Sequence, residues 1–156
     1  MTDYNTDYNA LLMAACKDDN LDILEKVLAA DASAIDINHT DESGNTALHY
    51  AATNASTGCL EILMFYDGIN VNGVDPTTGD TPLHRAATYP DAELALEMVQ
   101  ILITRGRANV SIENKDHKTA VDLVNSSTHQ LVKDYLERAA LGTHIDASPA
   151  DDSDDD

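Results

Sequence analysis

Residues 79–87 read GDTPLHRAA, and residues 44–52 read GNTALHYAA. The two stretches share a threonine, a leucine, a histidine and a pair of alanines in the same order, and Thr46 and Thr81 are 35 residues apart. Each stretch predicts the start of a helix, because a threonine hydroxyl can bond the exposed amides of a first turn. Pro82 agrees with this, since a first-turn residue needs no N–H. A recurring helix start predicts a recurring unit of structure.

Weaker copies of this unit lie on both sides. Residues 118–123 read KTAVDL, with the threonine 38 residues after Thr81, and residues 9–15 read NALLMAA, with the asparagine 37 residues before Thr46. Repetition at about 33 residues or slightly more predicts a solenoid in which each unit packs only on its neighbours. Both outer copies lack the motif histidine, as terminal units with a single neighbour are expected to do.

An amphipathic stretch follows each copy at a similar distance. Its apolar residues recur every three or four positions, which predicts a second helix with one buried face. The four stretches are residues 21–28, 59–64, 96–103 and 130–136. Segments between the units, such as residues 69–75 and 108–114, alternate or turn sharply, which predicts projecting fingers. The expected core residues of the central units are Leu48, Ala51, Ala52, Leu83, Ala86 and Ala87.

The complete motif TPLHxA at residues 81–86 and its near copy at residues 46–51 resemble the signature of the ankyrin-repeat family. The resemblance covers roughly residues 4–142. It implies an all-α repeat solenoid of about four ankyrin repeats, each a helix-turn-helix with a β-hairpin finger. It also implies that His49 and His84 bond the backbone of a neighbouring repeat rather than act in catalysis. We place the ankyrin-repeat domain at residues 1–143, with repeats at about 4–40, 41–75, 76–113 and 114–142, and a disordered acidic tail at residues 144–156.

The net charge is strongly negative. The 156 residues carry 28 acidic and 9 basic side chains, a net charge of −19, and without residues 144–156 the net charge is still −13. Such a field repels nucleic acid and favours encounter with a basic protein. Selection for solubility produces the same acidic excess, so the composition leaves both explanations open.

The sequence offers no catalytic or metal-binding motif. It contains no P-loop and no GxGxxG, HExxH or GxSxG pattern, and its six histidines are dispersed. Cys16 and Cys59 lack CxxC spacing and are expected as small buried residues. No apolar run approaches the roughly 18 residues of a membrane helix, and the first residues lack the positive charge of a secretory signal. We therefore expect a monomeric, non-enzymatic protein without cofactor or metal, in the cytoplasm or the nucleus.

The resemblance also implies where a protein partner binds. Partners of ankyrin proteins usually meet the concave face, which is made of the finger tips and the exposed side of the first helices. Register from the motif threonines gives Glu42, Ser43, Asn45, Thr53 and Asn54 in the second repeat, Thr77, Thr78, Asp80, Thr88 and Tyr89 in the third, and Lys115, Asp116, Lys118, Ser126 and Ser127 in the fourth. We expect Glu42, Asp80 and Asp116 to form one acidic stripe. Tyr89 is either an aromatic anchor or a cover for the loop that follows it.

Three functions fit these observations. The first is an adaptor or scaffold that docks one folded partner on the concave face. The second is an escort, or dedicated chaperone, of a strongly basic client such as a ribosomal protein or a histone. The third is an inhibitory or regulatory subunit that covers the active surface of an enzyme. All three are protein–protein interactions, and fold and charge alone do not choose among them.

Overall fold

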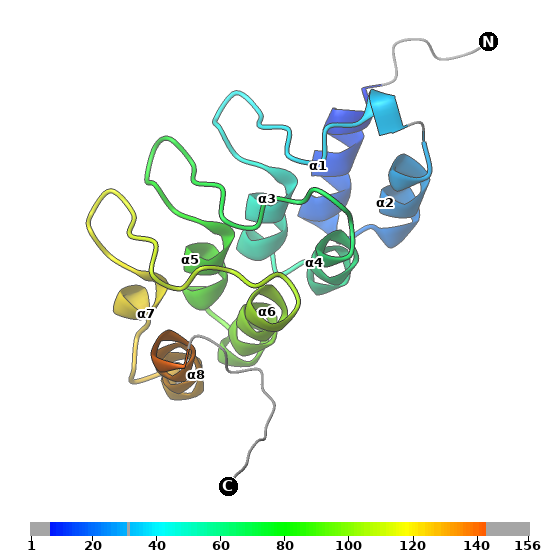
Figure 1. Ribbon diagram of the computed structural model, residues 1–156. Helices are drawn as coiled ribbons and strands as arrows, with labels where there is room; N and C mark the ends of the chain where they lie inside the picture. Colours follow the sequence, from blue (N-terminus) through cyan, green and yellow to red (C-terminus); the bar gives the residue numbers. More distant parts are fainter. Residues whose placement is uncertain (1–6, 31, 143–156) are drawn as a thin grey trace, which may run out of the picture.

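The computed structural model describes residues 7–30 and 32–142 (Figure 1). Within these ranges the chain forms eight α-helices and one short 3-10 helix. The elements are α1 (Tyr8–Asp18), α2 (Leu21–Leu28), η1 (Ala32–Ala34), α3 (Ala47–Thr53), α4 (Thr57–Met64), α5 (Pro82–Ala87), α6 (Ala92–Thr104), α7 (Ala120–Leu123) and α8 (Gln130–Leu141). The helices follow one another in pairs, as the repeated sequence pattern predicts.

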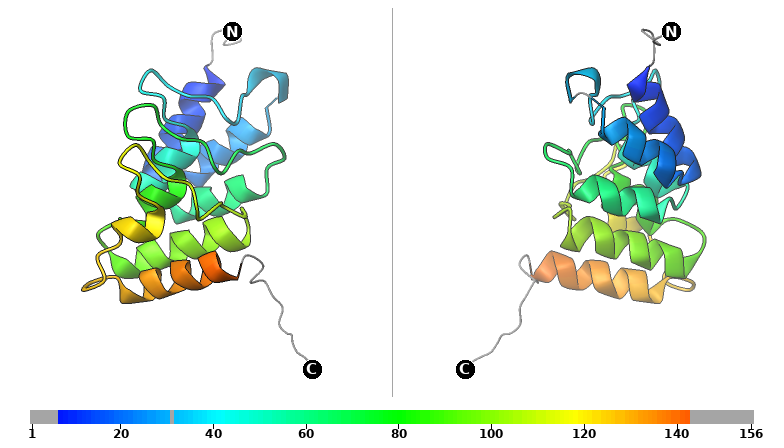
Figure 2. Two further views of the ribbon diagram at one scale, coloured as in Figure 1. Left: turned by 60° about the vertical axis from the view of Figure 1, so that its left-hand side comes forward. Right: turned by 90° about the vertical axis from the view of Figure 1, so that its right-hand side faces the viewer.

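The helices lie in two layers. One layer holds α1, α3, α5 and α7 and the other holds α2, α4, α6 and α8, and each helix contacts the next helix of its own layer as well as its partner in the pair (Figures 1 and 2). Three finger loops, at residues 36–46, 70–80 and 109–118, project side by side next to the first layer. The prediction of an all-α repeat solenoid is confirmed. The predicted disordered tail, residues 144–156, lies outside the described residues.

The predicted helix starts are confirmed in α3 and α5. The hydroxyl of Thr46 accepts a hydrogen bond from the His49 amide, and His49 Nδ1 accepts one from the Thr46 amide. Thr81 and His84 form the same reciprocal pair at α5. Because Nδ1 accepts, the ring proton lies on Nε2, which in His49 donates to the Asp80 carbonyl of the next repeat at 2.9 Å. The motif histidines therefore join consecutive repeats, as predicted.

The expected core residues are buried. Leu48 and Leu83 are each 1% exposed, and the alanine pairs that follow them are fully buried. Cys16 in α1 and Cys59 in α4 are free thiols inside the same core, which confirms the prediction that they are small buried residues. The neighbouring Cys16 side chain, together with burial, raises the pKa of the Cys59 thiol, so this thiol stays protonated.

The register predicted for the first repeat was wrong by one residue. The alignment of residues 9–15 equates Leu11 with the buried Leu48 of α3, but Leu11 is 37% exposed and Leu12 is fully buried. The buried Leu12 corresponds to Leu48, so Ala10 and not Asn9 matches the motif threonine. Asp7 caps α1 by accepting a hydrogen bond from the Ala10 amide at 3.0 Å, so the matching position lies inside the helix and no capping residue marks the register.

The fingers have the shape of hairpins but not the predicted β-structure. No residue within the described ranges belongs to a strand. Each tip is instead closed by two backbone hydrogen bonds. The amides of Asp41, Asp75 and Asn114 donate to the carbonyls of Asn45, Asp80 and Lys118, and the amides of Gly44, Gly79 and His117 donate to the carbonyls of Asp41, Asp75 and Asn114. A strand pair needs a ladder of such bonds. The short side chains of the tip residues supply the remaining bonds, and the fingers are therefore loops.

The fourth repeat is reduced, as expected for a terminal unit. Its first helix, α7, has four residues, and Asp122 stands where the central repeats have histidine. The Asp122 carboxylate accepts a hydrogen bond from the Thr119 amide at 2.9 Å, which holds the pKa of Asp122 below its ordinary value. The last helix, α8, ends at Leu141, and the φ of its C-cap residue Gly142, −109°, is one that any residue adopts.

Candidate protein-binding surface

We call the three finger tips, together with the exposed sides of α1, α3, α5 and α7, the concave surface (Figure 1). Each tip is held by the side-chain oxygen of its first residue. Asp41, Asp75 and Asn114 each accept hydrogen bonds from two backbone amides two to four residues further on. The third tip also rests on the second, because the Lys115 amide donates to the Thr78 carbonyl at 2.9 Å. The tips therefore form one continuous stack.

Glycines allow the fingers to stack. Gly44 and Gly79 have φ values of +82° and +76°, and His117 occupies the corresponding place in the third finger with a φ of +62°. A Cβ atom on Gly44 would lie 2.1 Å from Pro76 Cδ of the next finger. No further finger follows His117 within the described residues, so its side chain is 87% exposed and meets no such barrier. This explains why the last repeat departs from the motif glycine.

A buried ion pair connects the second finger to the helix layer. Arg85 donates to the carboxylate of Asp75 at 2.8 Å, and the same guanidinium donates to Asn45 and Thr53 of the preceding repeat. Asp75 is 2% exposed. Burial alone would raise the pKa of Asp75, but hydrogen bonds from Thr78, Arg85 and the tip amides outweigh burial and hold this pKa well below its ordinary value. The carboxylate is therefore a fixed structural anion.

A second polar group lies between the first two repeats. The hydroxyl of Tyr50 donates to the Asp41 carboxylate, and the ammonium of Lys17 lies over the Tyr50 ring, 4.5 Å from its centroid. Burial alone would raise the pKa of Asp41, but the bonds from Tyr50 and from the tip amides hold it below its ordinary value. Tyr50 and Arg85 are both partly buried.

A set of asparagines at the base of the fingers was not predicted from the sequence. The side-chain oxygen of Asn38 accepts a hydrogen bond from the Asn70 amide at 2.8 Å, and Asn72 accepts one from the Asn109 amide at 2.9 Å. These bonds tie each finger to the next. A signal was present, because residues 36–38, 70–72 and 109–111 each carry polar residues on both sides of an apolar one.

Most of the predicted partner-binding residues are exposed in the structure. The exposed members are Glu42, Ser43, Thr53, Asn54, Thr77, Thr78, Thr88, Lys115, Asp116, Lys118, Ser126 and Ser127. Asn45, Asp80 and Tyr89 are partly buried. Asn45 and Thr53 are occupied by Arg85, and the ammonium of Lys115 bonds the Pro76 carbonyl. Several of these side chains therefore also shape the surface.

The predicted acidic stripe is not formed. Asp80 directly precedes the motif threonine, as Asn45 and Lys118 do in the other two fingers, so it lies at the base of its finger and not at the tip. There its carboxylate accepts a hydrogen bond from the Asn114 side chain at 3.0 Å. Glu42 and Asp116 remain exposed at their tips. The two exposed carboxylates are thus separated by a finger whose outer residues, Pro76 to Thr78, are uncharged.

Tyr89 lies at the edge of the helix layer. Its side chain is partly buried against the core, and its carbonyl accepts a hydrogen bond from His129 Nε2 at 2.7 Å. His129 itself is 8% exposed. The contact joins the third repeat to the fourth. This geometry favours the interpretation of Tyr89 as a cover for the loop that follows it over that of an aromatic anchor.

Over residues 7–30 and 32–142, no group of three or more histidine, cysteine, aspartate or glutamate side chains could hold a metal ion. None of the helices in these ranges combines the length and the apolar character needed to cross a membrane.

Comparison with known proteins agrees with this architecture. The family profile described as "Ankyrin repeats (3 copies)" matches residues 2–75, and the profile described as "Ankyrin repeat" matches residues 78–115. The chain belongs to the ankyrin-repeat family. Repeats of this family serve generally as non-enzymatic interaction modules, and this ankyrin-repeat chain is a protein–protein interaction module.

Its curated relatives are much larger proteins. The chain is 28% identical over 139 residues to a probable serine/threonine-protein kinase of Dictyostelium discoideum, 33% over 102 residues to the human BCL-6 corepressor-like protein 1, and 30% over 115 residues to the mouse nuclear factor NF-kappa-B p105 subunit. These matches cover 87%, 65% and 74% of this chain, but only 16%, 5% and 11% of the respective relatives. The similarity to the kinase lies in the repeats of this chain.

Proposed function

We propose that this ankyrin-repeat protein binds a basic protein partner on its concave surface, as an adaptor without catalytic activity. The observation that carries the proposal is the contrast between exposed polar side chains and a fixed framework beneath them. Glu42 and Asp116 reach solvent from tips whose backbone is bonded internally and from finger to finger. A surface that is ordered before binding loses little conformational entropy when a partner docks.

The proposal also covers the location and the oligomeric state of the protein. We place it in the cytoplasm or the nucleus as a monomer, without direct contact to nucleic acid. Two free thiols inside the core fit a reducing compartment. The net charge of −19 opposes contact with a polyanion.

The test is a matched pair of charge reversals. Glu42→Lys with Asp116→Lys changes the concave surface, whereas Glu25→Lys with Glu93→Lys changes the net charge equally on the outer helices α2 and α6. The partner is first identified by crosslinking from the surrounding proteome, and its association rate with each variant is then measured by surface plasmon resonance. We expect the concave pair to slow association about tenfold or more and the outer pair to have a smaller effect. Equal effects of both pairs would refute the concave surface as the binding site.

An escort of a basic client is the second candidate, and the acidic body favours it. The two functions differ in their dependence on salt. An escort that shields positive charge should lose its client steeply as ionic strength rises, because exposed charge interactions are screened. An adaptor that relies on shape and hydrogen bonds should retain its partner, and a titration of the complex with sodium chloride separates the two.

A further inference from the structure

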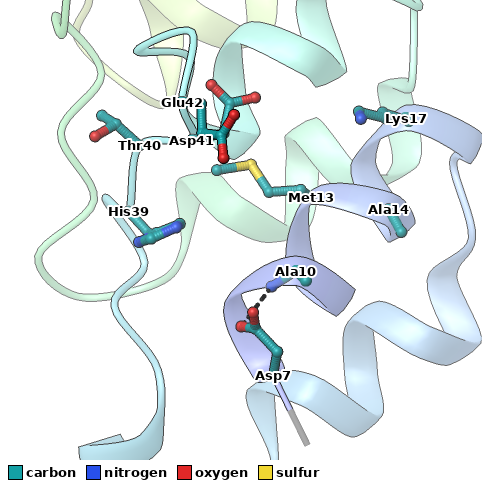
Figure 3. Close-up of a pocket in the computed structure, with 9 residues that line it drawn as sticks. All are labelled: Asp7, Ala10, Met13, Ala14, Lys17, His39, Thr40, Asp41 and Glu42. Carbon is teal, nitrogen blue, oxygen red and sulfur yellow. Dashed lines mark hydrogen bonds between the residues drawn. The ribbon is translucent and has the colours of Figure 1, made fainter.

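A hollow of about 550 Å³ lies on the concave surface between α1 and the first finger. From α1 and its cap come Asp7, Ala10, Met13, Ala14 and Lys17, and from the finger come His39, Thr40, Asp41 and Glu42. Figure 3 shows the two groups facing each other, with the Met13 side chain between them. No residue of the two complete motif copies, at 44–52 and 79–87, lines the hollow, and the fold alone does not assign it a role.

The floor of the hollow is apolar. Ala10, Met13 and Ala14 are three and four residues apart on one face of α1, so that their side chains form one strip. Met13 is 6% exposed, while the two alanines are exposed. Small side chains next to a flexible thioether leave room for an aliphatic chain to lie along the helix.

The rim of the hollow is acidic. Three carboxylates, Asp7, Asp41 and Glu42, face one ammonium, Lys17, and this ammonium is already engaged over the Tyr50 ring. The Asp7 and Asp41 carboxylates already accept hydrogen bonds from groups of the protein. Glu42 is exposed and has no hydrogen bond or ion pair within the described part of the chain. The rim therefore offers a net negative charge and one unpaired carboxylate.

The other two finger tips do not repeat this combination. In the second finger the corresponding outer residues are Pro76, Thr77 and Thr78, which carry no charge. The third finger carries Lys115 and Lys118 beside Asp116. An apolar floor joined to an acidic rim is thus confined to the first repeat among the described fingers, and this pattern matches a side chain with an aliphatic stem and a cationic head.

We propose that the hollow receives an arginine side chain of the protein partner. This inference rests on the proposed function and specifies its chemistry. The three methylenes of the arginine lie against Ala10, Met13 and Ala14, and the guanidinium meets Glu42 and the outer side of the Asp41 carboxylate. Arginine fits better than lysine, because its planar fork can bond two acceptors and is more weakly hydrated than an ammonium, which lowers the cost of partial burial.

The test uses a defined probe. Acetylated, amidated pentapeptides with arginine, lysine or citrulline at the centre of Ala-Ser-X-Ser-Ala are titrated into the ¹⁵N-labelled full-length chain at constant ionic strength. Citrulline keeps the shape of arginine without its charge. We expect saturable shifts of the Ala10, Ala14 and Glu42 amide signals with the arginine peptide, weaker ones with lysine and none with citrulline.

Variants then locate the effect. Glu42→Gln should weaken the arginine peptide about two- to fivefold, as expected for an exposed ion pair. Glu93→Gln on α6 removes the same charge elsewhere and should leave the affinity unchanged. Ala14→Trp fills the hollow from an exposed position and should abolish the shifts, while an unchanged circular dichroism spectrum shows that the fold is retained.

Three results would overturn the proposal: equal shifts with arginine and citrulline, equal affinity for arginine and lysine, or shifts spread over the outer acids such as Glu93. None of them would overturn the proposed function. If the charge reversal of Glu42 and Asp116 still slowed the association of the partner, the concave surface would remain the binding site, and only the arginine contact would be wrong.

Discussion

The stacking of the fingers can be tested at Gly44. Its φ of +82° lies in the left-handed region, and a Cβ atom there would come within 2.1 Å of Pro76 Cδ and 2.4 Å of Pro76 Cγ. The proline ring is tied to its own backbone and cannot rotate away. Gly44→Ala should therefore strain residue 44 and also push the second finger away from the first.

Gly68→Ala separates these two costs. Gly68 has nearly the same φ, +86°, but a Cβ atom on it would meet nothing within 4 Å. An alanine in the left-handed region costs about 1–2 kcal/mol, of which the reduced entropy of the unfolded chain returns about 0.4–1 kcal/mol. Gly68→Ala should therefore destabilise the protein by about 1 kcal/mol. Gly44→Ala should cost a further 1–3 kcal/mol or so, as overpacking of a filled site does.

Urea denaturation followed by circular dichroism measures both variants, with the free energy of unfolding extrapolated linearly to water. The decisive quantity is the difference between them. If Gly44→Ala and Gly68→Ala agreed within about 0.5 kcal/mol, the second finger would not be seated against the first in solution, and the concave surface would be less ordered than the structure shows.

Three further perturbations test the repeat core and its charges. Leu83→Ala should cost about 2–5 kcal/mol in thermal or urea unfolding. Leu131→Ala, at a position 68% exposed, should cost less than about 0.5 kcal/mol, and similar losses in the two variants would place Leu83 outside the core. Burial lowers the pKa of His49, so its contribution to stability is complete above about pH 6.5 and declines as the pH falls below that value. The loss of stability between pH 7.5 and 5.5 should accordingly be smaller in His49→Gln, and an unchanged loss would argue against a neutral buried ring. Because the pKa of Asp75 is lowered, its contribution to stability is complete above about pH 4 and is lost as the pH falls further. Asp75→Asn should cost about 3 kcal/mol at pH 7 and flatten the acid limb of the stability profile. Parallel profiles of the variant and the parent would exclude the ion pair with Arg85 as the cause of the acid limb.

The central repeats could be predicted because their signals are local. The threonine, proline, leucine and alanine positions of residues 46–52 and 81–87 act within one helix, and the structure places each as expected. Even the bond from His49 to the next repeat was predictable, since the family resemblance supplied it. Local chemistry repeated at a fixed spacing is enough to define a solenoid.

Features that depend on two distant segments could not be predicted. The first repeat was misaligned because Ala10, which matches Thr46, lies inside α1 while the cap is Asp7, so no capping residue marks the register within residues 9–15. The acidic stripe failed because Asp80 lies at the base of its finger, where the Asn114 side chain of the following finger bonds its carboxylate. The hollow joins α1 to residues 39–42, so its apolar floor and acidic rim become visible only when the two segments are placed together.

The structure also changes the meaning of the negative charge. Many aspartates accept hydrogen bonds from backbone amides at helix starts and turns, where an acceptor on a short side chain is required. Those that do so are Asp7, Asp19, Asp36, Asp41, Asp75, Asp91 and Asp122. Their number follows from the repeated caps and turns of the fold, so an acidic composition does not by itself indicate a basic partner.

The proposed recognition therefore depends on carboxylates without a structural bond. Glu42 is such a group, while its neighbour Asp41 accepts two tip amides and the Tyr50 hydroxyl. Replacing Glu42 changes the field at the hollow and leaves the finger intact. Replacing Asp41 would release the finger tip as well, so a loss of binding in that variant could not be assigned to charge. Of the two adjacent acids, Glu42 alone separates binding from folding.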